Sequence, residues 1–412
     1  MSKLKIAYLI SQYPAISHTF ILREVLSLRA MGLDIHVASI NAVDRSSEKL
    51  TDAERQEMHT TFYVKPAGIL GAIKAHTYTL FRHPMGYVRG LLFALKLGQT
   101  DFKKLLYRFF YFVEAVMVGR WMEQQGLSHL HVHFGMASAT VGMLTTKVFP
   151  VTLSMTIHGP DEFYDVYTNH LPEKILAADF ICCISDFARS QLMALSPPKE
   201  WQKLDVCPLG VDPATFMPPT LKEETAYFEI LCVGRLVPVK GQSILLEAVA
   251  QLIAQGQPIR LNFVGDGPDR QTLEGIVAEK QLTESVHFAG AVNQDKILTF
   301  YQQADVFILA SFAEGVPVVL MEAMAMEIPC ISTHITGIPE LIKKNAGILV
   351  PPGNAKELAK AIEQLINDPD LRKNLGKAGR EWVIQHYNLN KNTQTLLKLF
   401  QRRLTTNTFS QH

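Results

Sequence analysis

Short apolar runs alternate along this chain with longer stretches of helical pattern. Apolar, partly β-branched runs of this length are typical of strands buried on both faces of a parallel sheet. Their alternation with helices predicts an α/β fold whose parallel strands are joined by right-handed crossovers. The clearest strands are expected at residues 4–10, 35–40, 151–157 and 180–184 in the first half, and at 229–234, 260–264, 306–310 and 328–332 in the second.

The chain is too long for one hydrophobic core. A length of 412 residues favours two domains. Prolines and charged residues gather in 211–224, which is expected to be a linker. The predicted organisation is a Rossmann-like domain at 1–210, the linker, a second Rossmann-like domain at 225–389 and a helical segment at 390–412. The sequence contains no internal repeat and no low-complexity tract.

Two carboxylates flank the junction between an expected strand and the helix that follows it. The chain breaks at Gly315 and restarts at Pro317, so residues 318–326 are expected to form a helix whose free amides point back toward Glu314. Amides at a helix start bind anions, and carboxylates accept hydrogen bonds from vicinal hydroxyls. Glu314 and Glu322 therefore fit a polyhydroxyl, phosphate-bearing ligand. A lone pair of glutamates is more often a pair of solvated surface charges.

A basic segment upstream has the same arrangement of strand, glycine and loop. The expected strand 229–234 delivers Arg235 at its carboxyl end, and the loop supplies Lys240. A guanidinium and an ammonium beside one crevice would hold phosphate oxygens. Open α/β sheets bind ligands at the carboxyl ends of their strands, where both segments carry their charges. Alone, the two cations are equally typical of a solvated surface, but combined with the glutamates they predict a phosphate clamp.

The pairing of Gly234-Arg235…Lys240-Gly241 with Glu314-x7-Glu322 resembles the retaining glycosyltransferases of family 4, the glycosyl transferases group 1. The likeness extends over nearly the whole chain. It implies the GT-B fold, in which two Rossmann-like doubly wound parallel-sheet domains face a central cleft. The first domain would bind the acceptor and the second the nucleotide-sugar, with a C-terminal helix packing back on the first. The roles that it implies are donor diphosphate binding by Arg235, Lys240, Gly315 and Val316, contact of Glu314 with the donor sugar, and ribose binding by Glu322.

Further segments resemble landmarks of the same family. Gly265 and Asp266 lie in a strand-end turn that resembles one beside the nucleotide, although Gly-Asp-Gly alone is only a turn signal. The segment 208–212 resembles the hinge between the domains, and 288–290 resembles a turn near the base.

One histidine ends an expected strand of the first half. His158 follows the strand 151–157 and precedes Gly159 and Pro160. A lone histidine at such a place is more often structural, because its ring satisfies neighbouring backbone groups. The resemblance instead implies that His158 lies near the donor sugar and acceptor, so His158 and Glu314 are the catalytic candidates.

The loop after the first strand departs from the common family pattern. Many relatives carry a glycine pair here, whereas this chain offers Ser17, His18 and Thr19 after Pro14 and resembles a subgroup with a Ser-Gln-x-Pro loop. These residues are candidates for a donor or acceptor loop. Ser17 or Thr19 would cap the following helix and donate to phosphate, or would act only as an ordinary N-cap.

The sequence predicts neither a metal nor a cofactor. His131 and His133 lie two apart on an expected strand and share a face, but no suitable third ligand is near in sequence. Packing, or a place at the strand end near the acceptor, is the favoured interpretation. Cys182 and Cys183 are adjacent on an apolar strand and point to opposite faces. The five scattered cysteines are typical of buried thiols in a reducing compartment.

Positive charge is concentrated in residues 64–122. Nine lysines and arginines against Asp101 and Glu114 leave a local excess of +7, in a chain whose net charge is +1. Many aromatic residues accompany them, so this insertion is expected to contact an anionic membrane surface or a lipid-linked acceptor. An ordinary helical insertion with an aromatic core would also fit.

The near-zero net charge argues against nucleic-acid binding. No transmembrane helix and no signal peptide are expected. These features predict a cytoplasmic protein, peripheral on the inner face of the membrane if residues 64–122 bind it.

The expected function is that of a retaining, metal-independent hexosyltransferase in cell-envelope biosynthesis. It would move a sugar from a nucleotide-sugar to a hydroxyl of a lipid-linked, polysaccharide or glycolipid acceptor. The alternatives are a catalytically silent nucleotide-sugar-binding subunit of a polysaccharide assembly complex and a GT-B epimerase. The sequence names neither the base, the sugar nor the acceptor.

Overall fold

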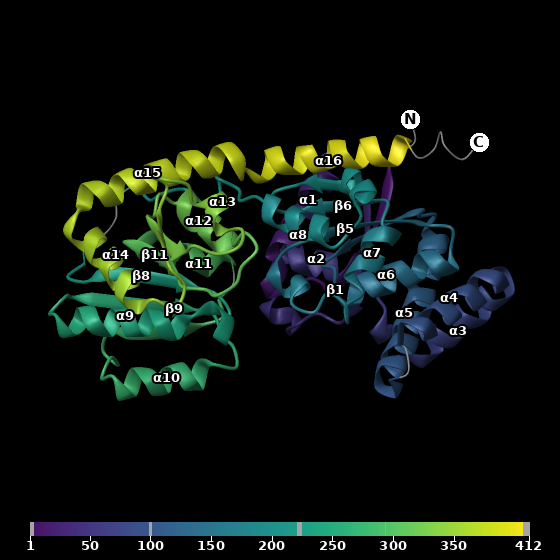
Figure 1. Ribbon diagram of the computed structural model, residues 1–412, viewed down its shortest axis with the longest axis horizontal. Helices are drawn as coiled ribbons and strands as arrows, with labels where there is room; N and C mark the ends of the chain where they lie inside the picture. The colour runs from purple at the N-terminus through teal and green to yellow at the C-terminus, as the bar shows by residue number, and fades with distance from the viewer. Residues whose placement is uncertain (1–3, 99–100, 221–224, 293, 407–412) are drawn as a thin grey trace. The chain divides into compact units, whose positions relative to one another are not determined.

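The computed structural model describes residues 4–98, 101–220, 225–292 and 294–406 (Figure 1). Its internal contacts divide the chain into two compact units. The first unit comprises Met1–Cys207 and Thr393–His412, and the second comprises Pro208–Asn392. The predicted linker 211–224 begins inside the second unit, and its residues 221–224 lie outside the described part.

The first unit contains a parallel sheet in the order β3-β2-β1-β4-β5-β6-β7. The strands are β1 Lys5–Gln12, β2 Asp34–Asn41, β3 Phe62–Tyr63, β4 His129–His133, β5 Thr152–Ile157, β6 Phe180–Cys183 and β7 Leu204–Val206. The α-helices are α1 Thr19–Ala30, α2 Asp52–Thr60, α3 Gly68–Arg82, α4 Pro84–Gly98, α5 Phe102–Gln125, α6 Ala137–Val148, α7 Leu171–Ala177 and α8 Asp186–Ala194.

The second unit contains a parallel sheet in the order β10-β9-β8-β11-β12-β13. The strands are β8 Phe228–Val233, β9 Ile259–Val264, β10 Val286–Gly290, β11 Val306–Leu309, β12 Cys330–Thr333 and β13 Ile348–Val350. The α-helices are α9 Gln242–Ala254, α10 Arg270–Glu279, α11 Gln294–Gln303, α12 Val318–Ala325, α13 Ile338–Leu341, α14 Ala355–Asn367 and α15 Pro369–His386, and α16 Leu389–Thr406 begins here and continues into the first unit.

The predicted fold class is confirmed. All eight expected strands form within one or two residues of their predicted bounds, and both sheets are parallel and wound in two directions from a central strand. Pro317 is the N-cap of α12 and not its first helical residue, as its extended ψ of 122° shows. In the part of the chain that the structure describes, no helix is long and apolar enough to cross a bilayer.

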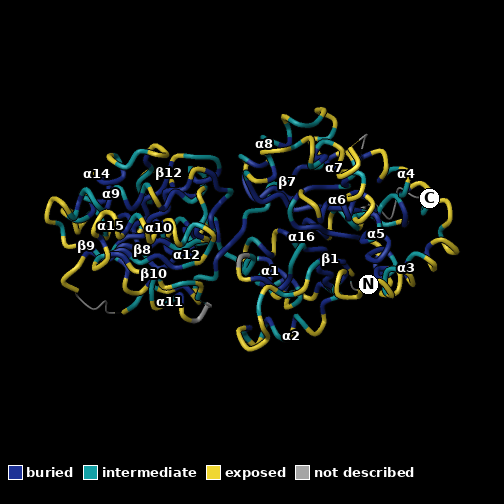
Figure 2. The backbone as a smooth tube through the Cα atoms, turned by 90° about the horizontal axis from the view of Figure 1, so that it is seen from below, coloured by how far each residue is buried: buried dark blue, intermediate teal, exposed yellow. Residues whose placement is uncertain are grey.

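The two faces of the first sheet build separate cores because successive strand residues point to opposite sides. On β1, Ile6 and Tyr8 join one core and Ala7 joins the other. Cys182 lies in the same core as Ile6 and Tyr8, and Cys183 lies in the other, as expected for adjacent residues of one strand. Helices α3 to α6 cover one face, and α1 with the end of α16 covers the other. Figure 2 shows the central strands as buried tubes among more exposed helices.

The last turns of α16 complete the first unit. Phe400 is fully buried, and its ring lies 6.4 Å from that of Tyr8, 5.1 Å from that of His131 and 5.9 Å from that of Phe180. Residues near the end of the chain therefore belong to a core that begins with its first strand.

The segment that resembles the family hinge is tied to the start of α16. The Val211 amide donates to the Tyr387 carbonyl at 2.8 Å, and the Leu389 amide donates to the Val211 carbonyl at 3.0 Å. A Cβ at Gly210 would collide with the Leu389 backbone.

We expect Phe400→Ala to destabilise the first unit by about 3–5 kcal/mol, because it deletes a buried aromatic ring and leaves a cavity. Thermal unfolding followed by circular dichroism measures the loss. Lys398→Ala, an exposed change on the same helix, is the control and should leave the transition unchanged. Equal transitions for both variants would show that α16 contributes little to this core.

Candidate functional site

The strand order of the second unit reverses at β8, which lies between β9 and β11. Crossovers leave β8 and β11 in opposite directions at such a point, and the diverging loops leave a crevice where open α/β sheets bind ligands. Lys240 lies in the loop after β8, and Glu314 lies in the loop after β11. The structure therefore brings together two residues that the sequence pattern singled out.

Glu314 is held by donors from both loops. Its Oε1 accepts hydrogen bonds from Lys240 Nζ and Ser311 Oγ, both at 2.6 Å, and the Thr336 hydroxyl donates to its main-chain carbonyl. The residue is only 8% exposed. A carboxylate at this depth with a cationic partner is an organised polar group and not a solvated loop charge.

Glu322 approaches from helix α12, eight residues further along the chain. Its Oε2 accepts a hydrogen bond from Tyr301 Oη of α11 at 3.0 Å, and Glu322 is 6% exposed. The prediction that one glutamate lies in the loop and the other in the helix is confirmed. Tyr301, Ser311 and Thr336 were missed by sequence reasoning, because no local motif marks a side chain that meets its partner only through the fold.

Glycines let the strand-end loops approach one another. Gly241 has a φ of +63°, and a Cβ there would collide with the Ala310 carbonyl oxygen. Gly265 has a φ of +141°, and a Cβ there would collide with the Gly234 carbonyl oxygen. Both positions need a residue without a side chain, for conformation and for space. The glycines of the sequence pattern thus bring the backbones of adjacent loops into contact.

The remaining predicted donor residues lie on the same sheet edge. Arg235 is exposed and follows β8, while its carbonyl accepts from Gln242 Nε2 at 3.0 Å. Gly315 and Val316 lie between Glu314 and the start of α12, whose first turn leaves amides without intrahelical acceptors. Asp266 is exposed at the end of β9, where its Oδ1 accepts from the Gly267 amide at 2.8 Å.

The first unit has its own reversal point, between β1 and β4. His158 directly follows β5, the next strand, and is 7% exposed. Burial, followed by the charges that His133 and His18 would carry, lowers the pKa of His158 well below its ordinary value. His158 is therefore a neutral imidazole at the carboxyl edge of this sheet.

A buried carboxylate fixes the backbone around His158. Glu162 Oε2 accepts from the amides of His158 at 2.6 Å and Gly159 at 2.8 Å, while Oε1 accepts from the Gly135 amide after β4. Burial raises the pKa of Glu162 to about 7, against the opposing effect of these amides and Lys174. Glu162 was missed by sequence reasoning, although its place four residues after His158 was a usable signal.

Lys174 supports the same loop from helix α7. Its side chain is fully buried, and Nζ donates to the carbonyls of Gly135 at 2.8 Å and Met136 at 2.7 Å. Burial, followed by the charge of Arg108, lowers the pKa of Lys174 to about 7. A lysine in a mostly apolar helix gives no sequence signal for this role.

His131 and His133 share a face of β4, as predicted, and the fold adds Glu24 of α1 to them. The potential ligand atoms of these three residues lie within 4.8 Å of one another. The third group was absent from the sequence prediction because it lies about a hundred residues away. However, His131 Nδ1 already bonds the Ser154 hydroxyl at 2.7 Å, and Nε2 bonds the Thr156 hydroxyl at 2.9 Å.

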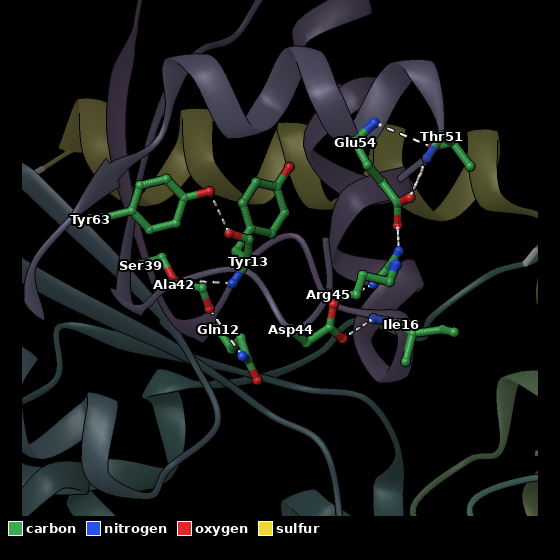
Figure 3. Close-up of polar contacts among 10 residues, drawn as sticks. All are labelled: Gln12, Tyr13, Ile16, Ser39, Ala42, Asp44, Arg45, Thr51, Glu54 and Tyr63. Atoms are coloured by element: carbon green, nitrogen blue, oxygen red, sulfur yellow. Dashed lines mark hydrogen bonds and ion pairs between the residues drawn. The ribbon is translucent and has the colours of Figure 1, made fainter. Parts of the chain in front are cut away.

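The loop after β1 is fixed by polar contacts from neighbouring elements (Figure 3). The Tyr13 amide donates to Ser39 Oγ at 3.0 Å, and the Ile16 amide donates to Asp44 Oδ2 at 2.8 Å. Arg45 joins Asp44 to Glu54 of α2. The conformation of this loop therefore depends on β2, on the segment that follows β2 and on α2, in addition to its own Gln12 and Tyr13 side chains, which donate to the Ala42 carbonyl and to Glu57.

Helix α1 receives no cap from its N-cap residue. That residue is His18, which makes no capping side-chain hydrogen bond, so the prediction that Thr19 caps this helix is wrong. The capping role expected of Ser17 stays a prediction. The 3₁₀ turn Ile16–His18 leads straight into the helix and makes Thr19 its first residue. The side chain of Ser17 lies outside the described residues. His18 Nδ1 is buried without a hydrogen-bond partner in the described chain.

Comparison with known proteins agrees with this geometry. The family model "Glycosyl transferases group 1" matches residues 215–382, which contain Lys240, Glu314 and Glu322. WcaL of Salmonella typhimurium, named as a glycosyltransferase of colanic acid biosynthesis, is 32% identical over 282 residues, which cover 65% of this chain and 69% of that protein. This chain belongs to the glycosyl transferases group 1.

Other relatives extend the likeness over the whole chain. WcaL of Escherichia coli strain K12 is 27% identical over 417 residues, which cover 97% of this chain and all of that protein. The crystal structure of Anabaena Alr3699/HepE in complex with UDP has a TM-score of 0.70 at 16% identity, covering 97% of this chain and 100% of that one. That likeness shows the GT-B fold, so the fold prediction and the group 1 resemblance are both confirmed.

We expect the stability of the wild type to fall relative to Glu162→Gln as the pH rises from 5 to 7. The folded-state pKa of Glu162 is raised to about 7 from 4.5. The folded state therefore holds this proton more tightly than the unfolded state, and the resulting stabilisation is lost as the pH rises through the folded pKa. Loss of Glu162 also lowers the folded pKa of Lys174 further, which acts in the same direction. Urea unfolding of both proteins at several pH values measures the difference, and parallel pH curves would contradict the assignment.

Proposed function

We propose that this group 1 glycosyl transferase is a retaining, metal-independent hexosyltransferase of family 4. The observation that carries the proposal is the ion pair between the half-buried Lys240 and the buried Glu314 at the reversal point of the second sheet, with Glu322 on the adjoining helix. A cation, two carboxylates and a helix start at one strand edge suit a diphosphate joined to a ribose and a sugar.

Each group has a role that follows from its chemistry. Arg235 and Lys240, with the amides of Gly315 and Val316, would bind the diphosphate and stabilise the charge that develops as it departs. Glu322 would accept hydrogen bonds from the ribose hydroxyls, and Glu314 from the donor sugar. These groups supply the electrostatic assistance that a divalent metal gives in other transferases, so we expect activity without a metal.

The first unit would present the acceptor. The acceptor hydroxyl would attack the anomeric carbon on the face from which the phosphate leaves, so the configuration is retained. The departing phosphate oxygen would take the proton of that hydroxyl. His158, a buried neutral imidazole, would accept a hydrogen bond from a substrate hydroxyl and so position it. Ser17, His18, Thr19 and Asp266 are the further residues that we propose as donor or acceptor contacts.

The acceptor that we propose is a lipid-linked, polysaccharide or glycolipid hydroxyl of the cell envelope. The names of both WcaL relatives assign them to colanic acid biosynthesis, and this supports a polysaccharide-building role. Alr3699/HepE was crystallised with UDP, which makes a uridine nucleotide the first donor to test. Contact of residues 64–122 with an anionic membrane belongs to the same proposal, because a lipid-linked acceptor lies at such a surface.

Calorimetric titration with UDP, GDP and ADP in a metal-free buffer tests the donor site. We expect one nucleotide to bind selectively, and Arg235→Ala and Glu322→Ala to weaken its binding by roughly 10- to 100-fold each, since each removes charge-assisted hydrogen bonds worth about 1.5–3 kcal/mol. Glu357→Ala removes an exposed carboxylate on α14 and is the matched control, with affinity unchanged.

Lack of binding by all three nucleotides would count heavily against the proposed transferase function. Unchanged nucleotide binding in both variants would show that the donor site lies away from Arg235 and Glu322. If a nucleotide-sugar is consumed and product forms only when acceptor is present, the enzyme is a transferase and not an epimerase or a silent subunit.

A further inference from the structure

Exposed apolar side chains gather on helices α3, α4 and α5. Fifteen of the large hydrophobic residues that the described chain exposes lie between Ile69 and Phe110, against ten elsewhere. Phe81 is 82% exposed, Met85 is 86% exposed and Phe102 is 79% exposed. Figure 2 shows exposed positions recurring along α3 and α4. A cluster of this kind marks an interaction surface, because soluble surfaces rarely gather large apolar side chains.

The opposite side of these helices packs against the core of the first unit. On α4, Ala94 and Leu97 are buried, and a Cβ at Gly86 or Gly90 would collide with Val148 of α6. The two glycines therefore allow α4 to pack closely against α6. Rotating α4 to bury its outer residues would break this contact, so the apolar outer face is a fixed feature of the folded unit.

The stretch that carries these apolar side chains is also positively charged. Between residues 65 and 110 the only carboxylate is Asp101, which is used as the N-cap of α5 and accepts from the amides of Lys103 and Lys104. The exposed cations of this stretch are Lys65, Lys74, Arg82, Arg89, Lys96, Lys103 and Lys104.

A groove of about 790 Å³ runs along α4. Its walls are largely apolar, and three cations, Arg89, Lys96 and Lys147, stand among them. Lys147 Nζ lies 5.1 Å from the centre of the Phe93 ring, and Arg89 Nε donates to the Lys147 carbonyl at 2.8 Å. The groove is lined by Pro84, Met85, Val88, Arg89, Leu92, Phe93, Lys96 and Lys147.

We propose that the face formed by α3, α4 and the first half of α5 docks on an anionic lipid bilayer. The groove along α4 would take an acyl chain, with the lipid phosphate on Arg89, Lys96 and Lys147. Apolar side chains that enter the acyl boundary, with lysines and arginines at headgroup level, are the composition that binds such surfaces. A second copy of this face is a poor partner, because a symmetric contact would place cations against cations.

Flotation with vesicles tests this docking independently of any transferase activity. We expect binding to vesicles of phosphatidylcholine with phosphatidylglycerol, and little binding to phosphatidylcholine alone. Lys103→Glu with Lys104→Glu should weaken binding by roughly tenfold or more, because each basic residue near an anionic surface contributes about 1 kcal/mol. Lys373→Glu with Lys377→Glu, on exposed positions of α15, is the matched control and should bind as the wild type does.

Insertion is measured separately from charge. The tryptophan introduced by Met85→Trp should be quenched by brominated acyl chains, whereas the one introduced by Met217→Trp, at another exposed methionine, should not. Equal binding to neutral and anionic vesicles, or no quenching at position 85, would overturn the proposal. Thermal unfolding shows whether each variant is folded.

A different observation supports a second inference, which concerns His158. A chain of buried polar groups leads to it from α1. Tyr8 Oη donates to Glu24 Oε1 at 2.8 Å, and that oxygen lies 3.4 Å from His133 Nε2. His133 Nδ1 then lies 3.0 Å from His158 Nε2. Tyr8 and His133 are fully buried and Glu24 is 7% exposed, so bulk water does not compete within this chain.

The far end of the chain is unsatisfied. His158 Nδ1 is buried and has no hydrogen-bond partner among the described residues. The rings of Phe20 and Phe134 lie 5.0 Å and 4.5 Å from the His158 ring. A buried polar atom without a partner is costly, and a ligand group is one way in which such an atom is satisfied.

The order of protons along the chain follows from the charge at its start. His133 Nε2 makes no hydrogen bond among the described residues, but the Glu24 carboxylate 3.4 Å away favours a proton on that nitrogen through its charge. In a neutral imidazole, Nδ1 of His133 is then an acceptor, so Nε2 of His158 must donate to it. That leaves Nδ1 of His158 without a proton.

We propose that Glu24 and His133 are positioning residues that hold His158 in the Nε2-protonated form, with Nδ1 ready to accept a hydrogen bond from a substrate hydroxyl. The proton arrangement on His133 and His158 does not depend on whether the protein is a transferase. The role of His158 Nδ1 toward a substrate hydroxyl rests on the proposed function.

Nitrogen NMR of protein with ¹⁵N-labelled histidine reads the tautomer directly. We expect His158 to be protonated at Nε2 in the wild type, and Glu24→Leu to give a mixture of tautomers. Glu24→Gln keeps an oxygen acceptor and should restore the wild-type form. If Glu24 served only to fill space, Glu24→Leu would keep the His158 tautomer at least as well as Glu24→Gln does.

Kinetics then separates the two parts of the proposal. Glu24→Leu should lower kcat by roughly 10- to 100-fold and leave donor affinity unchanged. The loss is smaller than the full contribution of an acid–base or orienting group, because His158 itself is still present. A fixed Nε2 tautomer in both variants would overturn the positioning role. Tight, stoichiometric binding of Zn²⁺ by the wild type that Glu24→Leu abolishes would also overturn it, and would assign Glu24, His131 and His133 to a metal.

Discussion

Parallel strand pairing is the constraint on which the rest of this structure depends. Because all paired strands in each sheet run the same way, every strand delivers its following loop to one edge. The order of each sheet reverses once, between β8 and β11 in the second unit and between β1 and β4 in the first. Loops that are far apart in sequence therefore meet beside these two positions, and the candidate residues lie on them.

Buried charges then fix those loops. Glu314 joins the loops after β8 and β11 through Lys240, and Glu162 joins the loops after β4 and β5 through backbone amides. Each carboxylate is stable at its depth because donors surround it, and removal of one partner would leave a buried charge uncompensated. Glu314 both organises its loop and takes part in the chemistry that we propose, whereas Glu162 organises the backbone that holds His158.

The sequence predicted much of the fold and part of the geometry of the candidate site. The eight clearest strands were recoverable because runs buried on both faces are mostly apolar. Arg235, Lys240 and Glu314 could be singled out because each lies in a loop that follows a strand, and Glu322 because it lies on the helix after the loop of Glu314. Glu162, Lys174 and Tyr301 were missed, because their partners are brought to them only by packing. The capping prediction for Thr19 was wrong because local propensity did not foresee the 3₁₀ turn that leads into α1 and makes Thr19 its first helical residue.

By itself, the sequence determined the class of fold, the strand ends and the chemical types available at them, since periodicity and glycine placement act locally. It also determined that residues 64–122 are basic and aromatic. Only the tertiary structure decided which of those side chains are exposed, because burial depends on which helix face the core occupies. It alone joined Glu24 to His133 and His158, since helix α1 and strands β4 and β5 meet only when the sheet has formed. The physical reason is that charge and hydrogen-bond pairing depend on distance in space, whereas a sequence fixes only distance along the chain.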